Sequence, residues 1–486
     1  MNTFAPVLNV LARIMVGYSL MFLVPLGWAW SLDHVMLRDV WQIGMAVTFG
    51  AGALLWLATN RQRRELLPRD GFLLVNLVWI VLPACSALPL MLAIDGLSWT
   101  DAYFEAMSAL TATGATVLTG LDSLPVSVNV WRCFLQLIGG LGIMLLVVAV
   151  LPLLGLGGVH LYKAETPGPM KDARLTPRIA ETARGLWSVY FVLSTACMLA
   201  YRWAGMSWPD AFMHMCTTMG LGGFSSHDAS FGYWNSAAIE GVAIVFMALA
   251  GISFARYFIV WRTRSALTLL RDAEVRMYVI VLLASVAAIT AVLGLQGTYE
   301  SWGMSLRAAG FHVVSLATTT GYAATDYALW PVFAPVWLVF LGTFVSCAGS
   351  TGGGIKMVRM VLLIKQARRE LVRAIHPRVV NPVIMGGSSI PGTVIASVMA
   401  YMLIYGATTI GLTVLMLLSG LDIVTAFSAV VATVNNIGPG LGQVGPDSNF
   451  GGLTDFQTWV CTVGMLMGRL ELLAVMVLFV PQFWRK

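Results

Sequence analysis

Four short segments of the chain bring threonine, asparagine and glycine together in a way that suits the binding of a dehydrated cation. Their sequences are Thr111-Ala-Thr-Gly114, Gly220-Leu-Gly222, Thr318-Thr-Thr-Gly321 and Asn435-Asn-Ile-Gly438. Glycine permits backbone angles that other residues resist, so carbonyl oxygens can be turned toward one axis. A ring of carbonyls can replace the hydration shell of a potassium ion. Because the segments recur at equivalent places, they predict one shared cation path.

Each segment follows an apolar stretch of about ten residues, starting near residues 99, 208, 309 and 422. A helix this short cannot cross a hydrocarbon core of roughly 30 Å. It must be re-entrant, and such backbone is stable only where it is buried or lines water. The partial negative charge at the end of the helix would point at the same axis. Asp101, Asp210 and Asp422 near the starts are expected to cap these helices.

The elements that position the four segments are long apolar spans. The chain has 486 residues, 58% hydrophobic and 11% charged, with a mean hydropathy of +0.80, whereas soluble domains carry about 25% charged residues. Continuous runs such as Phe72–Ile94 and Val394–Leu418 are long enough to cross a bilayer as helices. The alternating pattern of a barrel is absent from the sequence. We predict an all-α integral membrane protein with about ten transmembrane helices.

The order of the spans predicts two extra N-terminal helices followed by four span–pore helix–span repeats. The extra helices occupy residues 1–69, and the repeats occupy 70–160, 161–265, 266–380 and 381–486. Val7–Trp30 is longer than the apolar region of a signal peptide and has no clear cleavage site, so it is expected to be the first span. An even number of spans would leave both termini on one side of the membrane.

Positive charge is distributed as expected for membrane topology. Most of the 29 lysine and arginine residues fall at 61–69, 163–184, 256–276, 356–378 and 485–486, and these segments lie on one side if two spans separate neighbours. Cytoplasmic loops show this bias, so both termini are expected in the cytoplasm. The same distribution argues against nucleic acid as the reason for the net charge of +6. Segment 356–378 could also bind anionic lipid or a cytosolic partner, but topology alone explains it as well.

A glycine-rich run, Ser346–Lys356, interrupts the second span of the third repeat, with glycines at Gly349, Gly352, Gly353 and Gly354. A nucleotide-binding P-loop is excluded because Ile355 separates Lys356 from the glycines and no strand precedes the run. A membrane helix tolerates such a break where it lines a cavity. The alternative is a packing kink.

Several ionisable residues lie inside predicted membrane segments. Arg469 is in the last span, where a charge must face a partner or water, and Glu471 is too close in sequence to share its helical face. Arg469 could lie in the ion path or form a structural ion pair. Glu105, His214 and His312 fall in the short helices. Histidine there could carry a proton, but a hydrogen-bonded core role is the more frequent one.

Five motifs together resemble the Trk/Ktr/HKT superfamily of potassium transporters, and specifically its bacterial TrkH branch. They are Thr111-Ala-Thr-Gly-Ala-Thr, Gly222-Gly-Phe-Ser-Ser-His-Asp, Thr319-Thr-Gly-Tyr, Asn435-Asn-Ile-Gly-Pro-Gly-Leu-Gly and Gly468-Arg-Leu-Glu-Leu. The ending Phe483-Trp-Arg-Lys is similar too. The resemblance covers nearly the whole chain, and the motifs are specific as a set.

The resemblance implies a pseudo-fourfold pore within one chain, with potassium ions held at a selectivity filter. Gly114 favours potassium, since plant members that carry serine at this place conduct sodium. In the second repeat, Gly220, Gly222 and Gly223 also allow a shifted register. The implied potassium-binding residues are Thr111, Ala112, Thr113, Gly114, Gly220, Leu221, Gly222, Thr318, Thr319, Thr320, Gly321, Asn435, Asn436, Ile437 and Gly438.

The resemblance also implies how the pore is controlled and where it works. The run containing Gly349, Gly352, Gly353 and Gly354 would be an intramembrane gating loop, with Arg469 beside it in the ion path. The implied assembly is a homodimer in the bacterial inner membrane, in contact with membrane lipid and a cytosolic nucleotide-binding regulatory subunit of the TrkA type. Potassium would be the transported substrate, and neither an organic cofactor nor nucleic acid is expected.

Potassium movement through a gated, channel-like path is therefore the predicted function, and a sodium- or proton-coupled potassium symporter with the same filter is the alternative. A membrane-embedded enzyme is disfavoured because the spans contain no paired carboxylates, Ser/His pair or HExxH motif. The six cysteines are scattered and form no C-x-x-C pair, so neither a disulfide framework nor a zinc site is expected. A scaffold or receptor would not need four such segments.

Overall fold

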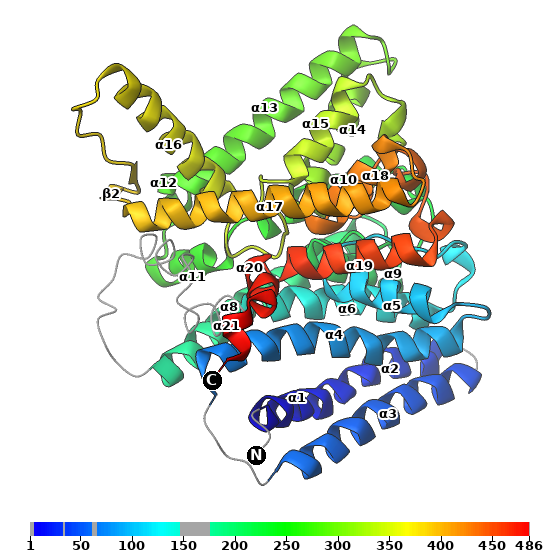
Figure 1. The fold of residues 1–486 in the computed structure, drawn as a ribbon. Helices are drawn as coiled ribbons and strands as arrows, with labels where there is room; N and C mark the ends of the chain where they lie inside the picture. Colours follow the sequence, from blue (N-terminus) through cyan, green and yellow to red (C-terminus); the bar gives the residue numbers. More distant parts are fainter. Residues whose placement is uncertain (1–3, 33–34, 61–65, 146–174, 486) are drawn as a thin grey trace.

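A computed structural model describes residues 4–32, 35–60, 66–145 and 175–485 of the chain. The two N-terminal spans are formed by α1 (Ala5–Tyr18) with α2 (Leu23–Leu32), and by α3 (Val35–Thr59). They pack against each other and against α4, on one side of the bundle (Figure 1). α3 approaches α1 closely at Gly52, where a Cβ atom would lie 3.0 Å from Met15. Small residues at such crossings let membrane helices pack tightly.

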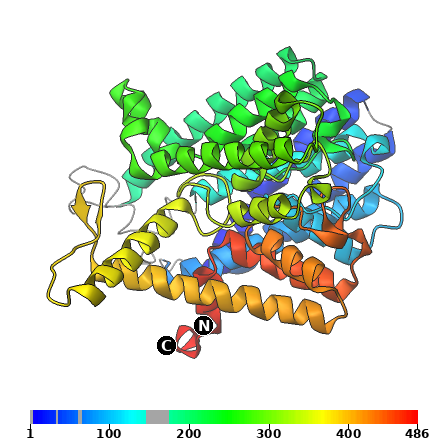
Figure 2. The same cartoon turned by 90° about the horizontal axis from the view of Figure 1, so that it is seen from above.

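The remaining helices form four units, each with a long helix, a short helix and a further helix. The first unit has α4 (Pro68–Ala93), α5 (Trp99–Leu110) and α6 (Val126–Leu145); the second has α8 (Leu175–Trp203), α9 (Trp208–Gly220), α10 (Ala237–Ala250) and α11 (Phe254–Thr263); the third has α13 (Ala273–Leu295), α14 (Trp302–Ala317), α15 (Phe333–Gly342) and α16 (Met357–Ile375); the fourth has α17 (Gly392–Leu418), α18 (Ile423–Val434), α19 (Asp455–Arg469) and α20 (Leu473–Met476). Two short helices, α12 (Leu267–Arg271) and α21 (Pro481–Trp484), complete the described part. Seen from above, α17 lies along one side of the bundle, and green helices of the second and third units lie along the opposite side (Figure 2).

Within the described ranges, up to nine of the about ten expected spans are long and apolar enough to cross a membrane. Seven helical segments are long and apolar enough to cross a membrane, and two bent helix pairs bring the number to nine. The second span of the third unit contributes only α15, because the helix stops after ten residues at the glycine-rich run. The all-helical membrane fold is therefore confirmed.

Breaks occur in more of the second spans than the sequence predicts. The axis turns by 86° between α10 and α11 and by 106° between α19 and α20. At the latter break Glu471 and Leu472 have positive φ angles of 56° and 51°. Hydropathy continues across both breaks, so the sequence pattern predicted uninterrupted spans there.

The short helices α5, α9 and α14 are capped by serine. Ser98 and Ser207 accept hydrogen bonds from the backbone N–H groups of Asp101 and Asp210. The predicted aspartate caps are therefore wrong in α5 and α9, where each aspartate is the third helical residue, and correct in α18, where Asp422 caps. Ser301 caps α14, so this helix starts at residue 302, earlier than the predicted 309.

A two-stranded hairpin, not foreseen from the sequence, follows α16. Strands β1 (Ile384–Met385) and β2 (Ser388–Ser389) pair in antiparallel fashion. Gly386 and Gly387 form the turn with positive φ angles of 57° and 83°, as the tightest hairpin turns require. The basic segments at 61–65 and 163–174 lie outside the described residues.

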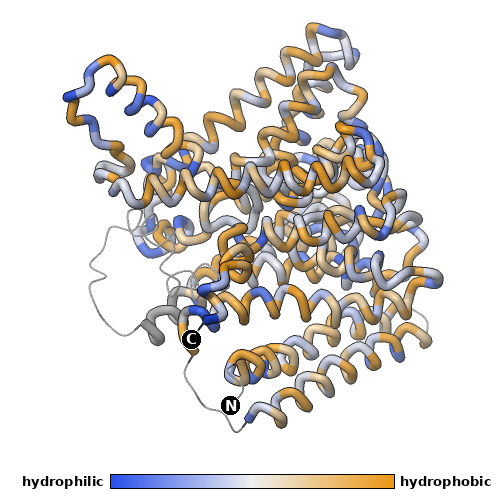
Figure 3. The backbone as a smooth tube through the Cα atoms, in the orientation of Figure 1, coloured by the Kyte–Doolittle hydropathy of each residue, from blue (hydrophilic) through white to orange (hydrophobic). Residues whose placement is uncertain are grey.

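The distribution of polarity is that of a protein surrounded by lipid. Apolar side chains project outward from the spans, such as Leu57 on α3 (70% exposed) and Leu403 on α17 (75% exposed). Figure 3 shows the long helices as predominantly hydrophobic along their length. By contrast, the threonines and asparagines of the four segments are buried at the centre of the bundle. Lipid-facing helices around a polar interior are typical of proteins that move polar solutes.

Candidate ion-binding site and the loop beside it

The four glycine-containing segments meet in a closed ring. We call residues 111–114, 220–223, 318–321 and 435–438 the ring. A Cβ atom on Gly114 would lie 2.0 Å from the carbonyl oxygen of Gly222, on Gly223 2.0 Å from that of Thr320, on Gly321 2.0 Å from that of Ile437, and on Gly438 2.8 Å from that of Thr113. Each unit thus packs its glycine on the next unit, and the fourth returns to the first. Side chains larger than hydrogen do not fit at these positions.

All four segments share one backbone pattern, and it fixes the register of the second. A residue with positive φ is followed two places later by a glycine with positive φ: Ala112 and Gly114, Leu221 and Gly223, Thr319 and Gly321, Asn436 and Gly438. The glycine equivalent to Gly114 is therefore Gly223, and the assignment to Gly222 from sequence is one residue early. Gly222 instead corresponds to Thr113, whose carbonyl the neighbouring glycine contacts. The run Gly220-Leu-Gly-Gly223 offers two adjacent glycines for this position, and the run by itself does not show which of them occupies it.

Pairs of threonine hydroxyl groups lie in the ring segments of the first and third units, and the fourth unit has Asn435 and Ile437 at the equivalent positions. The hydroxyl groups of Thr111 and Thr113 are 2.7 Å apart, and those of Thr318 and Thr320 are 2.8 Å apart. The second unit has glycine at both equivalent positions.

In the second unit, Gln136 from α6 occupies the space beside Gly222. Its amide donates to the carbonyl oxygen of Gly222 (2.9 Å) and accepts from the backbone N–H of Phe224 (3.2 Å). A Cβ atom on Gly222 would lie 2.4 Å from the Gln136 side chain. Sequence reasoning missed Gln136 because it lies on another span, and its only signal was a buried amide in an apolar helix.

Three ionisable residues of the short helices hold the extended segments that follow the ring. Glu105 accepts from the backbone N–H of Val117 (3.1 Å), His214 contacts the Ser225 hydroxyl (3.0 Å), and His312 accepts from the backbone N–H of Ala324 (3.2 Å). Each lies nine residues before its ring glycine when Gly223 is used for the second unit. This regular spacing supports the corrected register. The contacts of Glu105, His214 and His312 agree with the predicted role of hydrogen-bonded residues in the core.

Glu105 also forms a fully buried ion pair that the sequence did not reveal. Arg132 of α6 lies 2.6 Å from Glu105, and both side chains have no exposed surface. The same guanidinium donates to the Thr116 hydroxyl (3.2 Å) and to the Ser225 carbonyl oxygen (3.4 Å). Arg132 therefore joins the segments that follow the ring in the first and second units.

The glycine-rich loop, Ser346–Lys356, lies against the start of the ring segments. Thr351 donates to the carbonyl oxygen of Met219 (2.9 Å), and Ser346 donates to that of Thr318 (3.2 Å). A Cβ atom on Gly353 would lie 2.0 Å from the carbonyl oxygen of Asn435. The loop therefore contacts the second, third and fourth units directly beside the ring.

The four loop glycines have physical reasons to be glycine. Gly349 and Gly354 both have a φ angle of 77°, which other residues rarely adopt. Gly352 and Gly353 are in contact with neighbouring atoms, and a Cβ atom on Gly352 would lie 2.9 Å from the Thr318 carbonyl oxygen. A simple packing kink would not require all four.

Arg469 lies at the end of α19 and is 3% exposed. Its guanidinium donates to the carbonyl oxygens of Thr351 in the loop (2.8 Å) and Gly139 in α6 (3.0 Å). Among the described residues, no acidic side chain pairs with it, and Glu471 pairs with Arg359 instead. The acceptors of Arg469 are thus backbone carbonyls.

Lys356 adds a second buried positive charge at the loop. It has a φ angle of 79°, is 8% exposed, and its ammonium group donates to the carbonyl oxygen of Gly352. The sequence pattern around Lys356 excluded a P-loop but did not predict its position near Arg469.

On the opposite side of the ring, His227 joins loops of the first two units. Its imidazole contacts the carboxylate of Asp122 and lies 3.4 Å from that of Asp210. Burial alone would lower the pKa of His227, but hydrogen bonds to Asp210 and Asp122 outweigh burial and raise it. For Asp122, burial acts to raise the pKa, and the hydrogen bond to His227 outweighs it and lowers the pKa.

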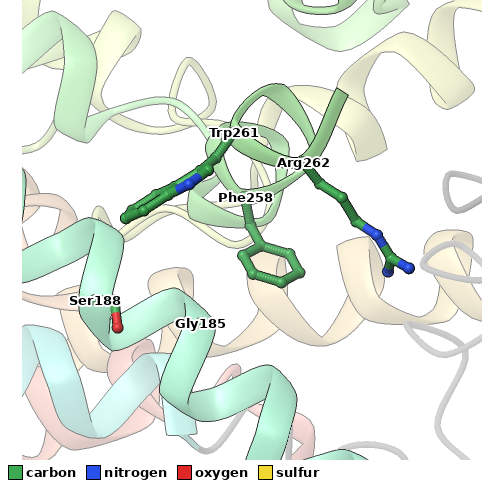
Figure 4. Close-up of a pocket in the computed structure, with 5 residues that line it drawn as sticks. All are labelled: Gly185, Ser188, Phe258, Trp261 and Arg262. Carbon is green, nitrogen blue, oxygen red and sulfur yellow. The ribbon is translucent and has the colours of Figure 1, made fainter. Parts of the chain in front are cut away.

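A hollow of about 300 Å³ lies away from the ring, between α8 and α11 (Figure 4). It is lined by Gly185, Ser188, Phe258, Trp261 and Arg262. The Phe258 ring packs on Gly185, where a Cβ atom would lie 2.5 Å from it. None of the residues predicted to bind ions or gate the path lines this hollow.

Membrane-spanning helices around buried polar segments that contact one another in a closed ring indicate a polytopic membrane transport protein. The family model for TrkH, described as a cation transport protein, matches residues 38–486. The chain belongs to the TrkH family, and this membership places it among transport proteins rather than enzymes.

Curated relatives and a solved structure agree with this membership. The chain is 44% identical to the Trk system potassium uptake protein TrkH of Halomonas elongata, over 99% of both chains. It is 43% identical to the protein of the same name from Escherichia coli K12, over 90% of this chain and 91% of the relative. The crystal structure of the potassium transporter TrkH from Vibrio parahaemolyticus superposes with a TM-score of 0.92 at 38% identity and covers all of both chains.

Proposed function

We propose that this chain is the pore-forming subunit of a potassium uptake system, in which potassium passes through the ring. The observation that carries the proposal is the closed contact of four segments with the same backbone pattern. Alternating positive φ angles in such a segment allow neighbouring carbonyls to face one side, as in filters that replace an ion's water shell. The relatives are named as potassium uptake proteins. The proposed ligands are the sequence-predicted residues of the ring, with Gly223 added.

Control of the path is assigned to the glycine-rich loop with Arg469. The loop contacts the carbonyl oxygens of Thr318 and Asn435, which are the first residues of two ring segments. Arg469 and Lys356 place positive charge beside it. At about 5 Å and an effective dielectric constant near 20, one such charge repels a potassium ion by about 3 kcal/mol. Loop and charges together would close the path until the loop moves.

Family membership supports a proposal for the partners and the membrane of this subunit. The name of the relatives refers to a system, which supports a further component, and we propose a cytosolic nucleotide-binding subunit of the TrkA type. A homodimer in the bacterial inner membrane, with both termini cytoplasmic, is part of the proposal. The amphipathic α16 carries several basic residues and projects from the bundle (Figure 1). It offers a surface for the regulatory partner or for anionic lipid.

Rubidium uptake into proteoliposomes tests the proposal. Purified protein should pass rubidium down its own gradient in preference to sodium. Uptake that requires an inward sodium or proton gradient would replace the channel-like path by the coupled symporter. Absence of rubidium uptake under every gradient, with folded protein in the vesicles, would contradict both.

A further inference from the structure

A single buried carboxylate holds both ends of the glycine-rich loop. Glu274 lies in the first turn of α13 and is 2% exposed. One oxygen of its carboxylate accepts hydrogen bonds from the backbone N–H groups of Ala348 (2.7 Å) and Val358 (3.2 Å). Ala348 precedes Gly349, and Val358 is the second residue of α16. Glu274 therefore bridges the entry and the exit of the loop.

The two hydrogen bonds to the Glu274 carboxylate are of the charge-assisted kind. A hydrogen bond to an ionised acceptor is roughly twice as strong as a neutral one, and low exposure strengthens it further. The N-terminus of α16 also carries a partial positive charge that favours a carboxylate. The residue at the cap position, Lys356, makes no capping hydrogen bond with its own side chain. Glu274 supplies from another helix the cap that α16 lacks.

Glu274 is itself tied to the neighbouring helices. The side chain of Asp272 caps α13 by accepting from the backbone N–H groups of Glu274 and Val275, both at 3.0 Å. Asp272 also forms an ion pair of 2.7 Å with Arg256 of α11. A movement of α11 or of the start of α13 would therefore reach both ends of the loop through Glu274.

We propose that Glu274 is a positioning residue that latches the glycine-rich loop against the ring, and that its separation from Ala348 and Val358 is a step in opening. The inference rests on the proposed gating role of the loop. Glu274 acts through the backbone of the loop and does not touch the ion.

Rubidium flux and thiol labelling of Glu274 variants test the latch. Glu274→Gln keeps an acceptor oxygen and loses the charge, whereas Glu274→Ala loses both. Flux per folded molecule, without any regulatory partner, should rise in both, more for alanine, where loss of two hydrogen bonds to a charged acceptor predicts a rise of about a hundredfold. Glu300→Gln is the matched control, because Glu300 is exposed beyond the other end of α13 and its removal changes the net charge equally.

Labelling of Cys347 reports the position of the loop without using ion flow. Cys347 is fully buried next to Ala348, so a membrane-impermeant maleimide should label it faster in the Glu274 variants, with Cys347→Ser as the blank. Faster labelling with raised flux supports the latch. Faster labelling with unchanged flux keeps the latch but overturns the gating role of the loop. Unchanged labelling overturns the latch, including the case in which the variants lose only thermal stability.

Discussion

Substituting Gly114 by serine tests the ring most directly, because the structure gives the size of the perturbation. Gly114 has a φ angle of 84°, and a left-handed backbone costs a residue with a side chain roughly 1–2 kcal/mol. The serine Cβ would also lie 2.0 Å from the Gly222 carbonyl oxygen. Ordinary van der Waals contact begins at 3.4 Å, which is 1.4 Å farther than 2.0 Å, so the carbonyl must move.

The moved carbonyl belongs to the proposed ion ligands, so Gly114→Ser should lower the preference for potassium over sodium. A loss of about 1.4 kcal/mol in that preference would reduce the flux ratio about tenfold. The assay compares rubidium and sodium uptake by wild type and variant in the same vesicles. Gly96→Ser is the control, because Gly96 has a similar φ angle of 78° but no atom within 4 Å of a Cβ. An unchanged ratio in Gly114→Ser would refute the role of the ring in selectivity.

Three further predictions concern the loop and the histidine cluster. Arg469→Ala should raise basal rubidium flux several-fold, since a charge that repels the ion is removed; lower thermal stability with unchanged flux per folded molecule would contradict this. Deleting residues 352–354 should also raise flux, and a folded variant with unchanged flux would identify the loop as a support. The stabilisation from the pairing of His227 with the two aspartates should be complete below the ordinary imidazole pKa of about 6.5. It should be lost as pH rises through the raised pKa of His227. The stabilisation from the Asp122 carboxylate should be lost only as pH falls through its lowered pKa. Thermal stability should therefore fall as pH rises above about 6.5, and His227→Gln should remove this fall; an identical pH profile in the variant would exclude His227 as its cause.

The sequence predicted the architecture well because membrane helices are determined by local properties. Continuous apolar runs define the spans, and a helix of about ten residues before a Thr/Asn–Gly segment identifies each re-entrant element. The four segments contact one another in the structure, as the sequence predicted. The start of α14 was misplaced because Ser301, the residue that caps it, was not recognised as a cap.

Contacts between distant residues could not be predicted in this way. Gly222 and Gly223 are adjacent in the sequence, and the positive φ angle of Gly223 and its contact with Thr320 in the next unit distinguish them. Gln136 and Glu274 lie 86 and 74 residues from the backbone groups they bind. Their roles depend on tertiary packing, which periodicity does not encode.

Gln136 supports the second unit at the place where the first and third units have a threonine pair, and this difference has a genetic consequence. In a pore built from four identical subunits, one codon change alters all four walls at once, and a costly change is multiplied by four. Here the four segments have separate codons, so the second unit can have glycines where the first and third have a threonine pair, with the amide of Gln136 from α6 beside them. Each quarter of the proposed pathway can therefore change separately from the other three.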